Sequence, residues 1–145
     1  MEIHEVTSVD DCRKLVPLFI KVFSEPPYEE AWSEEKAEKR IVETWLRGTG
    51  FNFFAKEDDV IIGMILCVTQ SWEDGDHLII EDCVVDSSLR GKGIGKELVF
   101  YLESVAISKG IVSIEGLVNK DAPAVHFWNK LGYPANGYFQ IRKIL

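Results

Sequence analysis

The segment that most constrains the fold of this chain runs from Val85 to Lys96, where an apolar stretch meets a glycine-rich turn. The residues before it, His77–Val85, have the apolar density of a strand that is buried on both faces. After it, apolar residues recur at helical spacing from Ile94 until Gly110, a glycine that favours a helix end. The segment therefore predicts a strand–turn–helix unit within an α/β domain.

The turn in this unit predicts an anion-binding site. Gly91, Gly93 and Gly95 leave backbone N–H groups uncovered by any Cβ atom, and the helix that follows adds partial positive charge at its first turn. Arg90 and Lys92 supply full positive charges beside these groups. A phosphate is the ligand that this combination favours.

Two common phosphate-binding patterns do not fit the turn. Gly91, Gly93 and Gly95 form a G-x-G-x-G pattern, which differs from the G-x-G-x-x-G pattern of dinucleotide-binding domains. A P-loop needs a glycine five positions before its Gly-Lys pair and Ser or Thr after it, but Arg90 precedes Gly95-Lys96 and Glu97 follows. Dinucleotide binding and nucleoside triphosphate hydrolysis are therefore disfavoured.

The rest of the 145-residue chain predicts one α/β domain over residues 1–145. Hydrophobic periodicity, caps and breakers predict strands at 2–6, 51–56, 60–69, 77–85, 111–118 and 138–145, and helices at 12–23, 33–45, 94–110 and 122–131. Residues 70–76 are expected to form a loop. This order predicts a mixed central sheet with helices on both faces.

Composition excludes several classes of partner. The chain has 16 Lys plus Arg against 24 Asp plus Glu, a formal net charge of −8 that disfavours nucleic acid and is compatible with a cationic partner. The longest apolar stretch is much shorter than the roughly 20 residues of a membrane-spanning helix, and we expect no membrane partner. The N-terminus lacks the pattern of a secretory signal, so we expect a cytoplasmic protein. Cys12, Cys67 and Cys83 have no C-x-x-C spacing and predict reduced thiols with no metal site.

Arg90-x-x-Gly93-x-Gly95, placed between a strand and a helix, resembles the GNAT superfamily of acetyl-CoA-dependent N-acetyltransferases, as does the downstream segment Asn119–Tyr133. The resemblance covers essentially the whole chain and fits its order of elements. It implies the GNAT fold, acetyl-CoA as co-substrate, and direct acetyl transfer to a primary amine. The residues that it implies for cofactor binding are the strand positions Cys83, Val84 and Val85, the loop positions Arg90, Gly91, Lys92, Gly93, Ile94, Gly95 and Lys96, and Asn119.

Two carboxylates interrupt the buried strand and are the candidates for the general base. Glu81 and Asp82 are adjacent, so in a regular strand only one of them can face a given side. Glu81 is the first candidate, and a β-bulge at this point would make Asp82 an equal one. The alternative is a structural role, in which they cap loops or pair with a nearby lysine.

The general acid has no clear candidate, because Trp128 stands where many members of the family carry a tyrosine. An indole N–H cannot serve as that acid. Tyr138 on the expected last strand, Tyr133 or a water molecule remain as alternatives, and Trp128 itself is more typical of core packing. This departure leaves open a non-catalytic acyl-CoA-binding sensor or regulatory module.

The segment between the first two helices is expected to wall the acceptor site, as it does in the family. There Tyr28 and Trp32 could stack on a substrate while Glu29 and its acidic neighbours attract positive charge. The expected acceptor is a small cationic amine, with a solvated acidic loop as the alternative interpretation. A protein N-terminal or lysine acetyltransferase would share the cofactor, and exposed edge strands are compatible with a homodimer.

Overall fold

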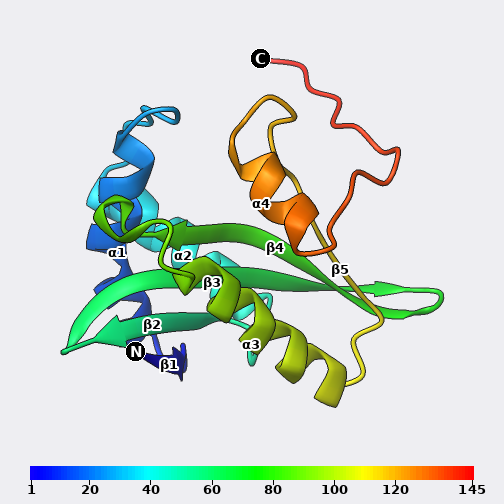
Figure 1. Cartoon of the computed structure of the whole chain (residues 1–145), viewed down its shortest axis with the longest axis horizontal. Coiled ribbons are helices and arrows are strands. Elements are labelled where there is room, and N and C mark those ends of the chain that lie inside the picture. Colours follow the sequence, from blue (N-terminus) through cyan, green and yellow to red (C-terminus); the bar gives the residue numbers. More distant parts are fainter.

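The computed structural model describes all 145 residues and shows a mixed five-stranded sheet with helices on both faces (Figure 1). The strands are β1 (Glu2–Glu5), β2 (Phe53–Glu57), β3 (Val60–Trp72), β4 (Gly75–Val85) and β5 (Ser113–Gly116). The helices are α1 (Val9–Ser24), α2 (Glu34–Leu46), α3 (Ile94–Ser108) and α4 (Ala124–Lys130), and the 3₁₀ turn η1 spans Ser87–Leu89. The sheet order is β1-β2-β3-β4-β5, antiparallel except for the parallel pair β4–β5. The predicted fold class is confirmed.

Helices α1 and α2 cover one face of the sheet. Both begin at a serine whose Oγ accepts a backbone N–H, Ser8 from Asp11 and Ser33 from Lys36. Their apolar residues pack with those of β2, β3 and β4 in a cluster of 13 buried residues, whose largest members include Leu15, Phe19, Ile41, Phe54, Met64 and Leu66.

Helices α3 and α4 cover the opposite face, on which a second cluster of 12 buried residues lies. Leu98 and Leu102 of α3 are fully buried against β2, β3 and β4. Phe127 and Trp128 of α4 pack at the margin of this cluster, and their rings meet edge to face. Core packing is therefore the observed environment of Trp128. No helix is both long and apolar enough to cross a membrane.

The structure corrects two sequence-based expectations. Residues 70–76 are not a loop, because β3 continues to Trp72 and β4 begins at Gly75 in a tight hairpin. The strand expected at Tyr138–Leu145 is absent: these residues lie outside any helix or strand and are exposed. Its alternating pattern fits a strand, but a strand also needs a neighbouring edge to pair with, which a local pattern does not supply.

A buried asparagine joins β2 to β3 where their ladder ends. The side chain of Asn52, fully buried, accepts the N–H of Cys67 at 2.9 Å and donates to the Cys67 carbonyl at 3.2 Å and to the Gly48 carbonyl at 2.7 Å. The amide thus replaces the backbone of a strand and satisfies buried groups that would otherwise lack partners. This contact fixes β3 at Cys67, one of the two residues at which the β3–β4 register shifts.

Candidate functional site

A β-bulge lies in the middle of β4. Leu66 of β3 faces Asp82, but the next residue, Cys67, faces Ile80, so Glu81 is the extra residue of the bulge. The structure therefore contains the irregularity that would re-aim both carboxylates.

The bulge changes the faces to which β4 side chains point. Ile80 packs in the cluster beneath α3, and Cys83 packs against the same cluster, although they are three residues apart. In a regular strand, residues three apart point to opposite faces. The shift lets the consecutive side chains of Glu81 and Asp82 reach the same residue of α2, Arg40.

Arg40 binds both carboxylates. Its Nε lies 3.1 Å from Asp82 Oδ2, and its Nη2 lies 3.4 Å from both Asp82 Oδ1 and Glu81 Oε2. The Asp82 side chain is only 8% exposed, whereas that of Glu81 is 31% exposed. Burial raises the pKa of Asp82, and the charge and hydrogen bonds of Arg40 oppose that rise. Asp82 is thus the buried member of the pair and Glu81 the accessible one.

A third carboxylate adds negative charge to this cluster. Glu30, from the segment between α1 and α2, contributes to the electrostatic environment of both Arg40 and Asp82. Its Oε1 accepts a hydrogen bond of 2.8 Å from the indole of Trp32. The carboxylate cluster, defined as Glu30, Glu81, Asp82 and Arg40, therefore holds three acidic groups and one basic group.

Strands β4 and β5 part beside this cluster. Their pairing ends where Ile80 faces Gly116, whereas β3 continues to pair with β4 as far as Val85. In Figure 1 the chain after β5 rises to α4 while β4 continues toward the glycine loop. The edge of β4 from Asp82 to Val85 is therefore free of a strand partner, and its outward backbone groups can pair with an extended ligand.

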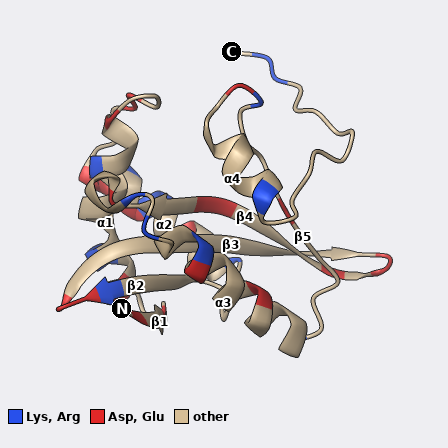
Figure 2. Ribbon diagram, viewed as in Figure 1, with Lys and Arg blue, Asp and Glu red and all other residues tan.

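The glycine loop follows directly. Gly91 and Gly93 have φ values of +79° and +83°, and a Cβ atom at either would meet nothing within 4 Å. Gly93 is the N-cap of α3 and provides no side-chain cap. No backbone carbonyl accepts the N–H groups of residues 90–96, and Figure 2 shows basic residues in the segment before α3. The loop therefore presents free donors and positive charge at a helix start, as an anion site requires.

Gly95 serves a different purpose from the two glycines before it. A Cβ atom there would lie 3.3 Å from the ring of Phe127 and 3.6 Å from Val85. Its missing side chain lets α4 approach the first turn of α3 closely. Ile94, beside it, is buried and anchors the loop in the core beneath α3.

Comparison with known proteins gives the family of this fold and loop. A family model described as the acetyltransferase (GNAT) family matches residues 18–133. The chain belongs to the GNAT acetyltransferase family. The matched range includes the carboxylate cluster, the glycine loop and α4. The family assignment therefore rests on the part of the chain that contains the candidate site.

Individual members of the GNAT family resemble this chain either over a short stretch of sequence or mainly in their fold. A glucosamine 6-phosphate N-acetyltransferase from Trypanosoma brucei brucei is 39% identical over 57 residues, which are 39% of this chain and only 37% of that protein. The crystal structure of a "possible acetyltransferase" from Clostridium difficile 630 superposes with a TM-score of 0.83 at 19% identity, covering 99% of this chain and 97% of the other. An aminoglycoside acetyltransferase from an uncultured soil metagenomic sample gives a TM-score of 0.76 at 18% identity, covering 99% and 95%.

The remaining residues of the predicted GNAT cofactor site lie in three places: the glycine loop, the free edge of β4 and the turn before α4. Arg90 and Lys92 are exposed, and the backbones of Cys83, Val84 and Val85 form the free edge. Burial raises the pKa of the Cys83 thiol to about 12, which does not favour a nucleophilic role. Asn119 is exposed at the turn before α4, and its Oδ1 accepts the N–H of Asp121 at 3.0 Å.

The tyrosines considered as general acids make no contact with the carboxylate cluster among the hydrogen bonds of the structure. Tyr138 is exposed on the C-terminal segment, and its backbone N–H donates to Asn136 Oδ1. Tyr133 packs on Trp128, and its hydroxyl donates a hydrogen bond of 2.8 Å to Glu103 Oε1. Burial and this carboxylate raise the pKa of Tyr133. Neither hydroxyl forms a hydrogen bond with Glu81 or Asp82.

The residues predicted to bind the acceptor divide into packed and exposed ones. Trp32 is half-buried and packs against the core beneath α1, where its ring meets Phe19 edge to face. Tyr28 is 42% exposed and its ring rests on Phe23, and Glu29 is exposed with a φ of +49°. Tyr28 and Glu29 are therefore the exposed members of this set, whereas Trp32 is half-buried and positions Glu30.

One residue of the carboxylate cluster gave no signal in the sequence. Arg40 precedes Glu81 by 41 residues and Asp82 by 42, and its position in the chain is that of an ordinary polar residue of an amphipathic helix. A pairing between a helix and a strand so far apart follows only from the packing of α2 on the sheet.

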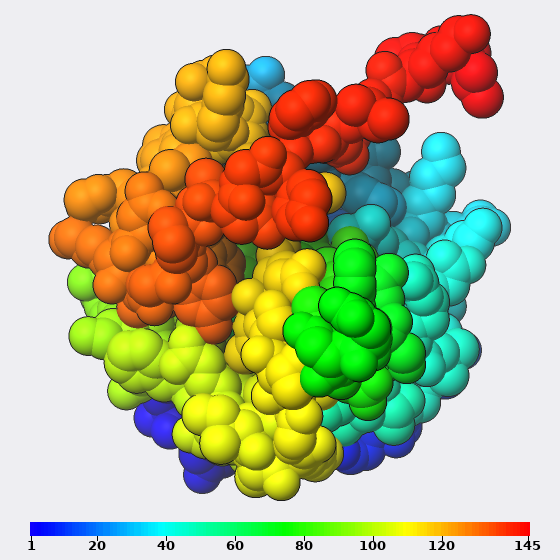
Figure 3. Space-filling view, turned by 90° about the vertical axis from the view of Figure 1, so that its right-hand side faces the viewer, coloured from blue at the N-terminus to red at the C-terminus, as the bar shows by residue number.

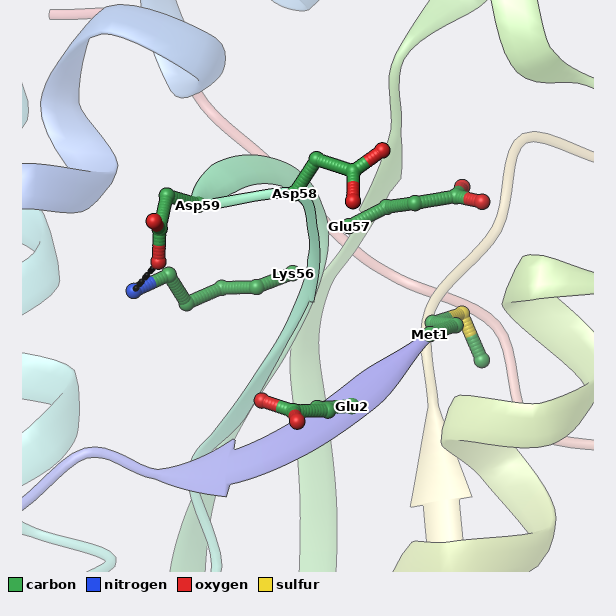
Figure 4. A pocket seen from close by; sticks show the side chains of 6 residues that line it. All are labelled: Met1, Glu2, Lys56, Glu57, Asp58 and Asp59. Atoms are coloured by element: carbon green, nitrogen blue, oxygen red, sulfur yellow. Dashed lines mark ion pairs between the residues drawn. The ribbon is translucent and has the colours of Figure 1, made fainter.

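A separate acidic hollow of about 320 Å³ lies at the β2–β3 turn, lined by Met1, Glu2, Lys56, Glu57, Asp58 and Asp59 (Figure 4). There Lys56 points to Asp59, with Nζ and Oδ1 3.7 Å apart, while Glu57 and Asp58 point the other way. The hollow shares no residue with the glycine loop or the carboxylate cluster, and we assign it no part in the GNAT chemistry.

Proposed function

We propose that the protein transfers an acetyl group from acetyl-CoA to the primary amine of a small cationic acceptor by direct attack. The observation that carries this proposal is the bulge at Glu81, which brings Glu81 and Asp82 to the same arginine. These carboxylates lie on β4 next to its free edge, and the glycine loop with its anion site follows β4 in the chain. An amine that reacts with a thioester must lose its ammonium proton, and a carboxylate within reach can accept it.

The residues of the loop and the free edge fit acetyl-CoA. The N–H groups of residues 90–96, with Arg90 and Lys92, would hold its diphosphate, because the positive φ of Gly91 and Gly93 leaves these groups open. The backbone of Cys83–Val85 would pair with the extended pantetheine arm, with Asn119 close to α4. When bound, acetyl-CoA supplies an acetyl group activated as a thioester.

Glu81 is the general base in this proposal. It is the more accessible of the two carboxylates, whereas Asp82 is buried and held by two nitrogens of Arg40. The base accepts the ammonium proton directly or through water. Arg40 and Asp82 position Glu81, and a backbone N–H of Cys83 or Val84 is the proposed donor to the developing oxyanion. Because neither tyrosine hydroxyl is hydrogen-bonded to the cluster, we propose that water protonates the leaving thiolate.

The charge of the site favours a cationic acceptor. The carboxylate cluster holds three acidic groups, of which the single charge of Arg40 can neutralise only one, and Glu29 and Tyr28 are exposed on the segment that carries Glu30. Aminosugars and aminoglycosides, which appear in the names of two similar proteins, carry amino groups of this kind. These names support an amine acceptor but do not identify it.

Two glycines offer a matched test of the cofactor site. Gly93 in the loop and Gly110 after α3 have φ values of +83° and +78°, and neither would place a Cβ atom within 4 Å of another group. Alanine at either position costs a similar strain of about 1–2 kcal/mol. Only the Cβ of Gly93→Ala would enter the proposed diphosphate site. We expect that variant to bind acetyl-CoA at least about tenfold more weakly, about 1.4 kcal/mol, by calorimetric titration.

Gly110→Ala is the control, since it should lose similar stability and keep the wild-type Kd for acetyl-CoA. Equal Kd values for the two variants would place the cofactor elsewhere and remove the basis of the proposal.

A further inference from the structure

A histidine near the start of β4 lies between two carboxylates. The Nε2 atom of His77 is 2.8 Å from Asp74 Oδ1, in the turn of the β3–β4 hairpin. The Nδ1 atom, on the other side of the ring, is hydrogen-bonded to Glu115 Oε1 on β5. The ring also stacks on Trp72 of β3, with the two centroids 5.1 Å apart and the planes inclined by 20°. One imidazole therefore joins the hairpin to β5, and we name the ring with its two carboxylate bonds the His77 bridge.

The hydrogen bonds of this bridge require an imidazolium. A carboxylate oxygen only accepts hydrogen bonds, so both ring nitrogens must carry a proton when both carboxylates are ionised. The side chain of His77 is only 12% exposed, against 60% for Asp74 and 35% for Glu115. The ion pairs of both carboxylates are with His77 alone. The charge on the ring thus balances two negative groups that have no other basic partner.

The other neighbours of the ring are neutral or acidic. Along and across the strands they are Gln70 and Trp72 of β3, Ser113 of β5, Glu73 of the turn and Asp76 of β4. Gln70 accepts the indole N–H of Trp72 at 2.9 Å, and Ser113 donates to Glu115 Oε1 at 3.1 Å. Glu73 is exposed, and Asp76 accepts a hydrogen bond of 3.3 Å from the Ser71 hydroxyl. No second cation competes with the ring for its carboxylates.

The charge of this ring depends on pH in a defined direction. Burial lowers the pKa of His77, but the hydrogen bonds and charges of Asp74 and Glu115 outweigh it, so the pKa lies above its ordinary value of about 6.5. The folded protein holds this proton more tightly than the unfolded chain does. The stability that the bridge contributes is therefore complete below a pH of about 6.5 and is lost as the pH rises through the raised pKa.

The His77 bridge holds a strand that has few other contacts in the sheet. β5 has four residues, and they pair with His77–Ile80 of β4 and with no other strand. Figure 3 shows the hairpin, in green, beside the segment that contains β5, in yellow. The two strands part at Gly116, where a Cβ atom would lie 3.3 Å from the Ile80 carbonyl oxygen. Glu115 is thus the residue next to this fork, and the free edge of β4 begins beyond it.

We propose that His77 is a pH-dependent positioning residue, which as an imidazolium holds β5 on β4 and so fixes the fork at which the free edge of β4 begins. When the ring releases a proton to water, one of its nitrogens becomes an acceptor and cannot bind a carboxylate. Either Asp74 or Glu115 then loses its donor on the ring, and β5 is held more weakly. The effect on the free edge rests on the proposed function, in which that edge pairs with the pantetheine arm.

The first test is hydrogen–deuterium exchange on the free protein at a pH of about 6 and of about 9, with rates corrected for the intrinsic pH dependence of amide exchange. We expect the protection factors of residues 113–116 in the wild type to fall by about threefold or more over this range. In His77→Gln they should be low at both values, because the amide side chain cannot carry the charge. Asp74→Asn, a change on the exposed turn, should move the loss of protection to lower pH, and it provides the test where His77→Gln does not fold.

His4→Gln is the matched control. The ring of His4 also stacks on an aromatic ring, that of Phe54, and contacts one carboxylate, that of Glu2. It lies on β1, at the opposite edge of the sheet from β5. This variant should therefore keep the wild-type dependence of protection on pH at residues 113–116.

The second test is calorimetric titration of acetyl-CoA at the same two pH values. We expect Kd to rise between them by about threefold more in the wild type and His4→Gln than in His77→Gln. Equal protection of residues 113–116 in the wild type and His77→Gln at both pH values would overturn the proposal, as would the same ratio of Kd values in both proteins. Absence of acetyl-CoA binding at either pH would remove the proposed function and the positioning role with it, while exchange would still decide whether His77 holds β5.

Discussion

Glu81→Gln is expected to lower kcat for acetyl transfer by about 10²- to 10⁴-fold at neutral pH. The variant keeps the shape of the side chain and its place on the bulge, but an amide cannot accept the ammonium proton. A base is needed only while the amine is protonated, so the deficit should shrink as the pH approaches the pKa of the acceptor. The measurement is the pH profile of kcat by steady-state release of CoA.

Two further variants make this result specific. Glu43→Gln on α2 removes an exposed carboxylate paired to Lys39 at 4.0 Å and should leave kcat and its pH profile unchanged. Asp82→Asn should weaken the hold of Arg40 on the cluster and lower kcat less than Glu81→Gln does. If the Glu81 variant keeps wild-type kcat at neutral pH, or if Asp82→Asn is the more damaging change, Glu81 is not the base.

Gly48→Ala is expected to destabilise the fold by more than about 4 kcal/mol, a size that single substitutions seldom reach. A Cβ atom at residue 48 would lie 1.9 Å from the carbonyl oxygen of Cys67 and 2.8 Å from its carbon. Both are backbone atoms held by Asn52, so they cannot move aside without breaking the hydrogen bonds of a buried amide. The free energy of unfolding from urea titration measures the loss.

Gly110→Ala serves as the control here as well, because it carries the strain of a positive φ but meets no neighbouring atom. It should lose only about 1–2 kcal/mol. Equal stabilities for the two alanine variants would show that the backbone at Cys67 can move away from residue 48 at little cost, although Asn52 is hydrogen-bonded to it.

The sequence predicted those parts of the fold and site that are encoded locally. Gly91 and Gly93 predicted the open turn, because glycines at alternate positions before a helix favour a backbone with positive φ, which both residues adopt. The apolar periodicity of α1, α2 and α3 predicted their buried faces, and together with the loop it led to the GNAT family.

The parts that were missed depend on contacts between distant segments. Nothing in the residues around Arg40 shows that it pairs with Glu81 and Asp82, since that contact requires α2 to lie across β4. The position of the bulge depends on how Cys67 and Asn52 fix β3. The expected strand at Tyr138–Leu145 failed for the same reason, because its alternation specifies faces but not the edge that receives it.

The charge distribution links the fold to the proposed chemistry. Figure 2 shows acidic residues in β4 and basic residues in the segment that joins β4 to α3. Positive charge at Arg90 and Lys92 suits a diphosphate, and negative charge around Glu81 suits an ammonium group. The two substrates of an acetyl transfer differ in charge in this way, so each is drawn to its own part of the site.

The most direct test of this account is CoA release from acetyl-CoA by the full chain in the presence of a panel of amines. The panel should contain small polyamines and aminosugars, neutral amines, and peptides with free N-termini or lysines. We predict release that depends on the amine and is fastest with small cationic acceptors. Binding of acetyl-CoA with no amine-dependent release across the panel would contradict a catalytic role and favour a non-catalytic acyl-CoA-binding module.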